Sequence, residues 1–306
     1  MAPPSGAARR ISPLVQTFLQ GAIGGLLIGG TYALIALGLN IVFGTMRVIN
    51  FAQGTLLMAG MFLVYWLWVL TGLHPYLSPL VTVPLLFGLG YVIQKALVAP
   101  LFARERAREP MSVLLLTLGL ALALENLALL FFAADFKTVQ TDLAMRTFKV
   151  GGIIVSVPRL IGLLTAGISG AALYLFFTRT DLGRAVRATG QDREVARLMG
   201  IDDFRVYNVA FGLSAGLMGI AAAILVPFYY VHPAVGTSFI LKAFVIVVLG
   251  GMGSMPGAAL GGLIVGVIEG VVGVYVQAAV AQIVLFALFV AILSVRPTGL
   301  LGVERR

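Results

Sequence analysis

The sequence contains no cysteine and only two histidines among its 306 residues. Without cysteine the chain cannot form a disulfide, a thiolate nucleophile or a Cys-ligated metal site. His74 and His232 each precede a proline in a predicted loop, and no carboxylate cluster accompanies them, so the pair does not make a metal site. We expect neither a metal nor any other cofactor.

Charged residues are also scarce. They make up 11% of the chain, against about 25% in soluble domains, while 60% of the residues are hydrophobic. This composition indicates a polytopic membrane protein. The net charge of +9 comes from Arg and Lys placed between apolar blocks, as the positive-inside rule describes, and not from a basic stripe. We therefore expect no nucleic-acid partner.

Two motifs that suggest enzymes lack their necessary companions. The segment from Gly212 to Gly216 fits G-x-S-x-G, but Ser214 lies in a helix-length apolar run without a histidine partner. We interpret its small residues as a close helix contact. The glycine-rich segment from Gly250 to Gly262 lacks the Lys-Ser/Thr ending of a P-loop. The chain is therefore expected to be neither an enzyme nor an ATP-binding protein.

The apolar blocks are long enough to cross a bilayer, which takes about twenty residues per helix. They predict an all-α bundle of eight transmembrane helices, or alternatively ten, with broken or re-entrant segments. Residues 1–12 are polar and lead into an apolar stretch too long for a signal peptide, which indicates an uncleaved cytoplasmic start. Most basic residues fall in predicted internal stretches, so both termini are expected in the cytoplasm, and this requires an even number of crossings.

The number of crossings depends on residues 14–71. The block from Leu14 to Phe43 exceeds the length of one crossing, so it forms either a steeply tilted helix or two elements broken near Gly29. Gly21, Gly25 and Gly29 recur at four-residue spacing, which predicts a face for close helix packing.

The segment from Gly44 to Gly54 interrupts the apolar run with polar residues. One interpretation is a broken helix beside a translocation route, because irregular backbone at membrane depth needs protein or a cavity around it. Asn50 would then cap the next helix. A tight turn outside the membrane is the alternative. An internal similarity between residues 42–46 and 248–252 further suggests that the breaks at Gly44 and Gly250 meet.

Polar residues inside apolar blocks are candidate functional residues because hydrocarbon penalises them. Glu125, Asn126 and Glu269 are the clearest cases, and two interpretations stay open. The carboxylates act as proton relays, or they are structural and pair with Arg47 or Lys242. The predicted translocation path comprises Asn40, Arg47, Asn50, Gln53, Glu125, Asn126 and Glu269.

Two polar segments connect the apolar blocks. Residues 134–159 form a predicted periplasmic loop with a short strand or hairpin near residues 150–158. The second segment, from Thr178 to Asp203, is the longest polar stretch. Thr189 and Asp192 fit a capping box for a helix of about two turns, with an apolar stripe and Gly200 as its stop. The stripe consists of Val195, Leu198 and Met199.

The second polar segment also resembles a known one. Arg184-Ala-Val-Arg-Ala188, followed by Glu194-Val-Ala196 and Gly200, is similar to the cytoplasmic coupling loop of ATP-binding cassette importer permeases. Three further segments resemble the branched-chain amino acid permease family (the LivH-like subunit). They are GTYALIALGLNIVFGTMRVINFAQG from Gly30, GGMGSMPGAALGG from Gly250, and RPTGLLG from Arg296. The resemblance covers nearly the whole chain.

The resemblance implies a single permease domain over residues 1–306, located in the bacterial inner membrane and surrounded by lipid. Its implied partners are a second permease subunit, two cytoplasmic ATP-binding subunits and a periplasmic or lipid-anchored solute-binding protein. The implied cargo is leucine, isoleucine or valine, or a similar small solute. The implied coupling residues are Arg184, Arg187, Asp192, Glu194, Val195, Arg197, Leu198, Met199 and Gly200.

Two alternatives to an importer subunit remain at the sequence level. A self-sufficient ion-coupled carrier or channel, for example for urea or an amide, would depend on Glu125 and Glu269. A purely structural membrane subunit is the other, although polar gaps at membrane depth argue against a scaffold.

Overall fold

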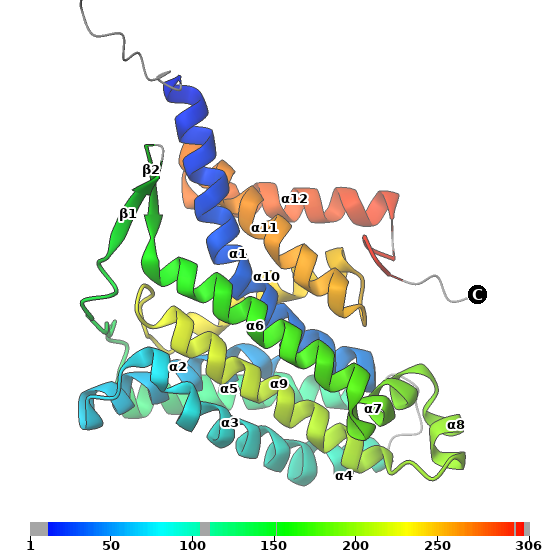
Figure 1. Cartoon of the computed structure of the whole chain (residues 1–306). Helices are drawn as coiled ribbons and strands as arrows, with labels where there is room; N and C mark the ends of the chain where they lie inside the picture. Colours follow the sequence, from blue (N-terminus) through cyan, green and yellow to red (C-terminus); the bar gives the residue numbers. More distant parts are fainter. Residues whose placement is uncertain (1–11, 105–110, 151, 297, 303–306) are drawn as a thin grey trace, which may run out of the picture.

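The computed structural model describes residues 12–104, 111–150, 152–296 and 298–302, and most of them are helical (Figure 1). The elements are α1 (Pro13–Met46), α2 (Ala52–Thr71), η1 (Pro75–Leu77), α3 (Pro79–Ile93), η2 (Gln94–Val98), α4 (Ala99–Arg104), α5 (Met111–Phe132), β1 (Thr147–Val150), β2 (Ile153–Ser156), α6 (Val157–Arg179), α7 (Asp181–Gln191), α8 (Arg193–Leu198), α9 (Asp203–Leu225), α10 (Val235–Gly250), α11 (Met255–Tyr275) and α12 (Ala278–Val295).

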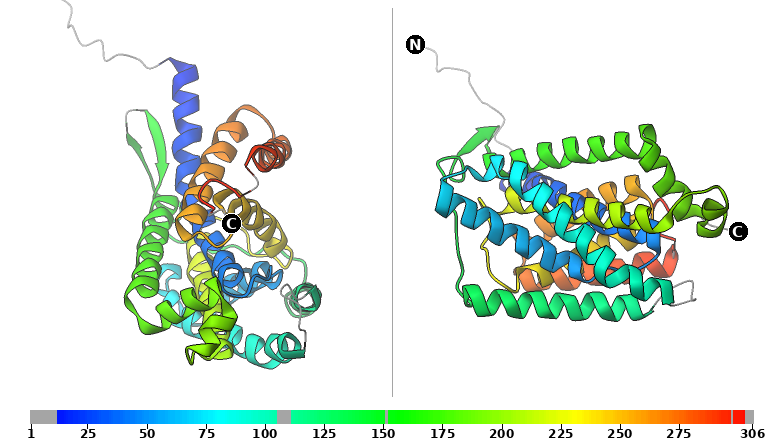
Figure 2. Two further views of the ribbon diagram at one scale, coloured as in Figure 1. Left: turned by 90° about the vertical axis from the view of Figure 1, so that its right-hand side faces the viewer. Right: turned by 90° about the horizontal axis from the view of Figure 1, so that it is seen from below.

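This architecture confirms the predicted all-α polytopic membrane protein. Among the described residues, seven helices are long and apolar enough to cross a membrane, and α10 and residues 280–295 of α12 are shorter apolar helices. In both α1 and α9, 83% of the most apolar 18-residue stretch is buried inside the bundle. Helices α5 and α6, by contrast, lie at opposite edges of the bundle (Figure 2, right). The apolar side chains exposed on the edge helices form the kind of surface that lipid covers.

Helix α1 is a single helix of 34 residues, so the tilted-helix alternative is the one that forms. At 1.5 Å per residue it is about 51 Å long, well beyond the roughly 30 Å of a hydrocarbon core. Gly29 and Gly30 stay helical because neighbouring helices pack directly on them. Leu263 of α11 contacts Gly29, and Leu163 of α6 contacts Gly30.

Small residues bring α1 and α11 together as an antiparallel pair. The facing residues are Gly21 with Gly270, Gly25 with Gly266, and Gly29 with Gly262. Glycines at four-residue spacing on both helices let the two backbones touch, which is how helices associate tightly in lipid. The predicted packing face of α1 is confirmed, and α11 carries a matching one.

The direction of α1 defines two ends of the bundle. At its start, Gln16 Nε2 donates to Gly152 O in the β1–β2 turn (2.8 Å). At its other end, Gly44 lies against Gly190 of α7. We call these the hairpin end and the α8 end.

The described chain finishes at the α8 end. Gly253, in the turn after α10, packs against Gly44, and Leu301 N donates to Gly250 O (3.0 Å). The start of α1 and the last described residues therefore lie at opposite ends of the bundle. Seven long helices and two shorter apolar ones are available for crossings among the described residues. The number of crossings and the cytoplasmic location of both termini stay predictions, since residues 1–11 and 303–306 lie outside the described part of the chain.

The predicted break after Gly44 is present. Arg47 ends α1 in the left-handed conformation, with φ of 55°. Asn50 Oδ1 then accepts a hydrogen bond from Ala52 N (3.0 Å), so Asn50 bonds a free amide at the start of α2, although the N-cap position itself is occupied by Phe51. The breaks at the ends of α1 and α10 also meet, as the internal similarity suggested, although Gly44 contacts Gly253 and not Gly250 itself.

The first polar segment contains the predicted hairpin. β1 and β2 pair antiparallel, with Thr147 opposite Ser156 and Val150 opposite Ile153. The hairpin begins three residues earlier than expected. Gln20 attaches it to α1 by bonding both the N–H and the C=O of Ile154 (2.8 and 2.7 Å).

Candidate functional site

The second polar segment folds into two consecutive helices and not one. Thr180 caps α7 by accepting from Gly183 N (3.0 Å), and the helix buries a face at three-residue spacing, formed by Gly183, Val186 and Thr189. Gly190 closes the contact to the end of α1. The sequence contained this signal, namely a threonine cap followed by an acidic residue and a periodic apolar face, but the two glycines and many charges of residues 181–191 resemble a loop.

The predicted capping box is wrong in one position. Thr189 lies inside α7, where its hydroxyl donates to Ala185 O (2.9 Å). Asp192 alone caps α8, accepting from Glu194 N and Val195 N (2.9 and 3.1 Å). A threonine hydroxyl can bond the carbonyl four residues earlier, which lets it sit within a helix. Gly200 ends the turn after α8 with φ of 83°, as predicted.

The apolar stripe of α8 faces away from the protein. Val195, Leu198 and Met199 expose 55%, 85% and 78% of their surface, and we call these three residues the α8 patch. Scattered exposed apolar residues are ordinary, but a contiguous group at a polar end of a membrane bundle marks an interaction surface.

Helix α8 is tied to the core helix α9 through one buried carboxylate. Arg193 Nε and Arg197 Nη2 lie 2.6 and 3.0 Å from Asp203 Oδ2, and the Asp203 side chain is only 4% exposed. A carboxylate held by two guanidinium groups is a strong and directional link. A displacement of α8 would therefore move the start of α9.

The remaining coupling candidates surround the patch. Arg184 pairs with Asp181 on α7, and Arg187 and Glu194 are exposed. The structure thus brings all nine residues together at the α8 end, on α7, α8 and the turn that follows.

The polar residues predicted to line a path are divided among several places. Asn50 and Gln53 are buried and join a network between three helices. Ser214 Oγ of α9 lies 2.7 Å from Gly38 O of α1 and 2.8 Å from Gln53 Oε1 of α2, while Asn50 Nδ2 donates to Gln53 Oε1 (3.4 Å). Ser214 thus cross-links helices, in agreement with its interpretation as a contact residue.

Replacing Ser214 by alanine is expected to lower the free energy of unfolding by about 1–2 kcal/mol, because it removes the buried hydroxyl that bonds Gly38 O and Gln53 Oε1. Thermal unfolding in detergent, followed by circular dichroism, measures the change. Ser294→Ala is the matched control, since Ser294 is exposed and bonds only the carbonyl of Val290 in its own helix. Equal effects of the two substitutions would show that the network does not stabilise the bundle.

Three other path candidates lie near ends of the bundle. Asn40 Oδ1 accepts from Gly253 N (2.8 Å) and so connects α1 to the turn after α10. Arg47 is exposed at the α8 end. Asn126 is exposed and bonds Leu122 O of its own helix (2.8 Å).

Glu125 belongs to the hairpin end. Its Oε2 lies 3.5 Å from Thr237 Oγ1. Burial lowers the pKa of the nearby His232 below its usual value, and the Glu125 carboxylate opposes this shift. The two carboxylates proposed as relays are not hydrogen-bonded to each other.

Glu269 forms the structural pair that the sequence left open. Its Oε1 lies 2.6 Å from Lys242 Nζ, which also donates to Tyr32 OH (2.9 Å). These residues come from α11, α10 and α1. Pairing with Lys242, and not with Arg47, is therefore confirmed for Glu269.

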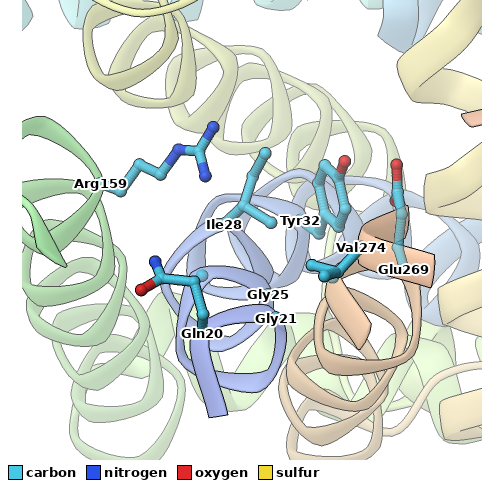
Figure 3. Close-up of a pocket in the computed structure, with 10 residues that line it drawn as sticks. Gln20, Gly21, Gly25, Ile28, Tyr32, Arg159, Glu269 and Val274 are labelled. Atoms are coloured by element: carbon cyan, nitrogen blue, oxygen red, sulfur yellow. The ribbon is translucent and has the colours of Figure 1, made fainter. Parts of the chain in front are cut away.

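A cavity of about 300 Å³ adjoins this pair and is bounded by α1, α6 and α11 (Figure 3). Arg159 of α6 enters it from the opposite side. In the sequence, Arg159 was assigned only as the last residue of the first polar segment. Its position did indicate a functional residue, because it is basic and begins an apolar helix on the predicted outer side, where basic residues are few.

Comparison with known proteins gives a consistent result along the chain. The family described as branched-chain amino acid transport system / permease component matches residues 21–293. The chain is 30% identical to the high-affinity branched-chain amino acid transport system permease protein BraD of Pseudomonas aeruginosa, over 95% of this chain and 97% of BraD. It is 30% identical to LivH of Salmonella typhimurium (93% and 96% covered) and 29% identical to the probable LivH of Methanocaldococcus jannaschii (94% and 93% covered). No solved structure matches the chain.

Proposed function

Because the chain belongs to the branched-chain amino acid transport system permease family, we propose that it is the membrane-spanning subunit of an ATP-binding cassette importer for branched-chain amino acids. Relatives that match over nearly their whole length carry that description. The chain itself is a multi-pass protein of the inner membrane, with seven helices long enough to cross it among the described residues.

The α8 patch is the observation that supports an external source of energy. The sequence contains no P-loop, so ATP must be hydrolysed by another subunit. The patch offers that subunit an apolar contact of about one helical turn, flanked by the charges of Arg187 and Glu194. The Asp203 link then carries a displacement of α8 into α9.

The proposed complex contains a second permease subunit, two ATP-binding subunits and a solute-binding protein. The ATP-binding subunits contact the α8 end, which is then cytoplasmic. The solute-binding protein docks at the hairpin end, on residues 134–159 and the turns near His74 and His232. Closure of the ATP-binding subunits pushes α8, and the core helices rock between inward-open and outward-open states.

The contacts inside the bundle do not favour an ion-coupled carrier. Glu269 is held by Lys242, and Glu125 lies at the hairpin end against Thr237. A proton relay needs carboxylates that follow one another along a route, whereas Glu125 and Glu269 have different partners and are not hydrogen-bonded to each other.

Reconstitution tests the proposed function directly. Proteoliposomes that contain the chain with its cognate subunits are expected to take up leucine only when ATP and the solute-binding protein are both present. Proteoliposomes with the chain alone serve as the control, and they are expected to show no uptake under an imposed proton or sodium gradient. Gradient-driven uptake by the chain alone would establish the carrier and overturn the importer assignment.

A further inference from the structure

The cavity between α1, α6 and α11 has the size and lining of a site for a small ligand. Its volume of about 300 Å³ lies at the lower limit of the roughly 300–1,000 Å³ typical of ligand pockets. Ile28 and Val274 supply apolar surface, and the glycines of α1 and α11 leave the backbone bare beside them. A small aliphatic group fits such a wall.

Opposite charges stand on two sides of this cavity. Figure 3 shows Arg159 on one side and Glu269 with Tyr32 on the other, with Ile28 between them. Polar groups at membrane depth rarely face lipid and usually mark a ligand pathway or a protein contact. The cavity is therefore unsuited to acyl chains, although its walls are partly apolar.

Both charged groups retain unused capacity. In the described part of the chain, no carboxylate lies within ion-pair distance of Arg159, whose guanidinium carbon is 5.9 Å from the Phe228 ring centre. Glu269 uses Oε1 for Lys242, while its Oε2 is buried and has no hydrogen-bond partner in this structure. A buried carboxylate oxygen without a donor is costly unless a ligand supplies one.

We propose that the cavity recognises a zwitterionic aliphatic amino acid by its backbone groups during passage. The α-carboxylate pairs with the Arg159 guanidinium, a geometry that allows two parallel hydrogen bonds. The α-ammonium donates to Glu269 Oε2, and the side chain packs on Ile28 and Val274. This assignment rests on the proposed function and names the residues that select the cargo.

A second cavity gives the site an entrance. It has a volume of about 360 Å³ and shares Gln20 and Val274 with the first one. Its other lining residues, Pro13 and Gly152 among them, belong to the hairpin end. A solute released at that end reaches Arg159 and Glu269 along the side of α1.

Uptake of L-leucine by reconstituted complexes, measured against leucine concentration, tests the site. Arg159→Met and Glu269→Gln are each expected to raise the half-saturating concentration about tenfold or more, because each removes a charged hydrogen bond to the solute. The ATP-binding subunits should still co-purify with both variants. Lys95→Met is the matched control, because Lys95 is an exposed charge of η2 outside the cavity, the docking segment and the coupling residues, and this variant should transport as the unmodified chain does.

A double variant separates recognition from structural support. Glu269→Gln with Lys242→Met removes both charges of the pair, so uptake returns if Glu269 only neutralises Lys242, and that result overturns the site. Continued loss of uptake by a variant that assembles supports recognition. Unchanged half-saturation in the single variants overturns the site and leaves the importer assignment standing, whereas absence of leucine uptake by the unmodified complex overturns both.

Discussion

Replacing Leu198 by aspartate is expected to reduce ATP-driven uptake about tenfold or more and to release the ATP-binding subunits during purification. Leu198 is 85% exposed in the centre of the α8 patch, so the change removes a contact from the partner without disturbing the fold of this chain. The few hot-spot residues near the centre of an interface contribute about 2 kcal/mol or more, which corresponds to a weakening of more than tenfold, and aspartate adds a charge to the apolar contact. Co-purification and leucine uptake by the reconstituted complex are the measurements.

Two further variants make this experiment specific. Met145→Asp is the matched control, because Met145 is 74% exposed but belongs to the first polar segment at the hairpin end, and it should leave the ATP-binding subunits bound. Asp203→Asn should leave them bound as well but separate ATP hydrolysis from uptake, since it weakens the link from α8 to α9. Normal association and transport by Leu198→Asp would remove the coupling role of α8.

The second large effect concerns the packing of α1 against α11. Gly266→Leu is expected to prevent the bundle from folding, with loss of the monodisperse protein peak in detergent. A Cβ at Gly266 would overlap the backbone of Gly25 and Gly29, and backbone atoms of two packed helices cannot give way as a flexible side chain can. Overpacking a core costs about 1–3 kcal/mol for extra methylenes that side chains can accommodate, so overlap with backbone should cost at least as much.

A glycine two turns further along the same helix provides the control. Gly273 has no atom within 4 Å of the position of an added Cβ, and Gly273→Leu should therefore fold normally. Size-exclusion chromatography and thermal unfolding compare the two variants. If both variants behave alike, close approach of α1 and α11 is not what holds the bundle together.

Much of the fold follows from local signals in the sequence. Long apolar runs predict membrane helices because each helix satisfies its own backbone hydrogen bonds in lipid. The hairpin near residues 150–158 and the stop at Gly200 also depend on only a few neighbouring residues, and both are present. Asn50 bonds the first amide of α2 as expected, one position before the N-cap Phe51. The sequence also predicted that Glu269 pairs with either Arg47 or Lys242, because a buried carboxylate needs a partner.

Other features depended on contacts that the sequence does not specify. Helix α7 forms because Gly183 and Gly190 allow α6 and α1 to approach it, although glycines in a polar segment ordinarily indicate a loop. Helix α1 remains unbroken at Gly29 because α11 packs on it. In both cases the partner helix lies far away in the sequence.

The sequence by itself determined the membrane class, the apolar helices, the family and the apolar stripe of α8, because hydropathy, capping and motif spacing are properties of neighbouring residues. Only the tertiary structure decided that Asp203 ties α8 to α9, that Ser214 joins three helices, and that Arg159 and Glu269 face one cavity. Each of those arrangements joins residues from different helices, and the packing of whole helices, governed by where glycines permit close approach, sets which side chains meet.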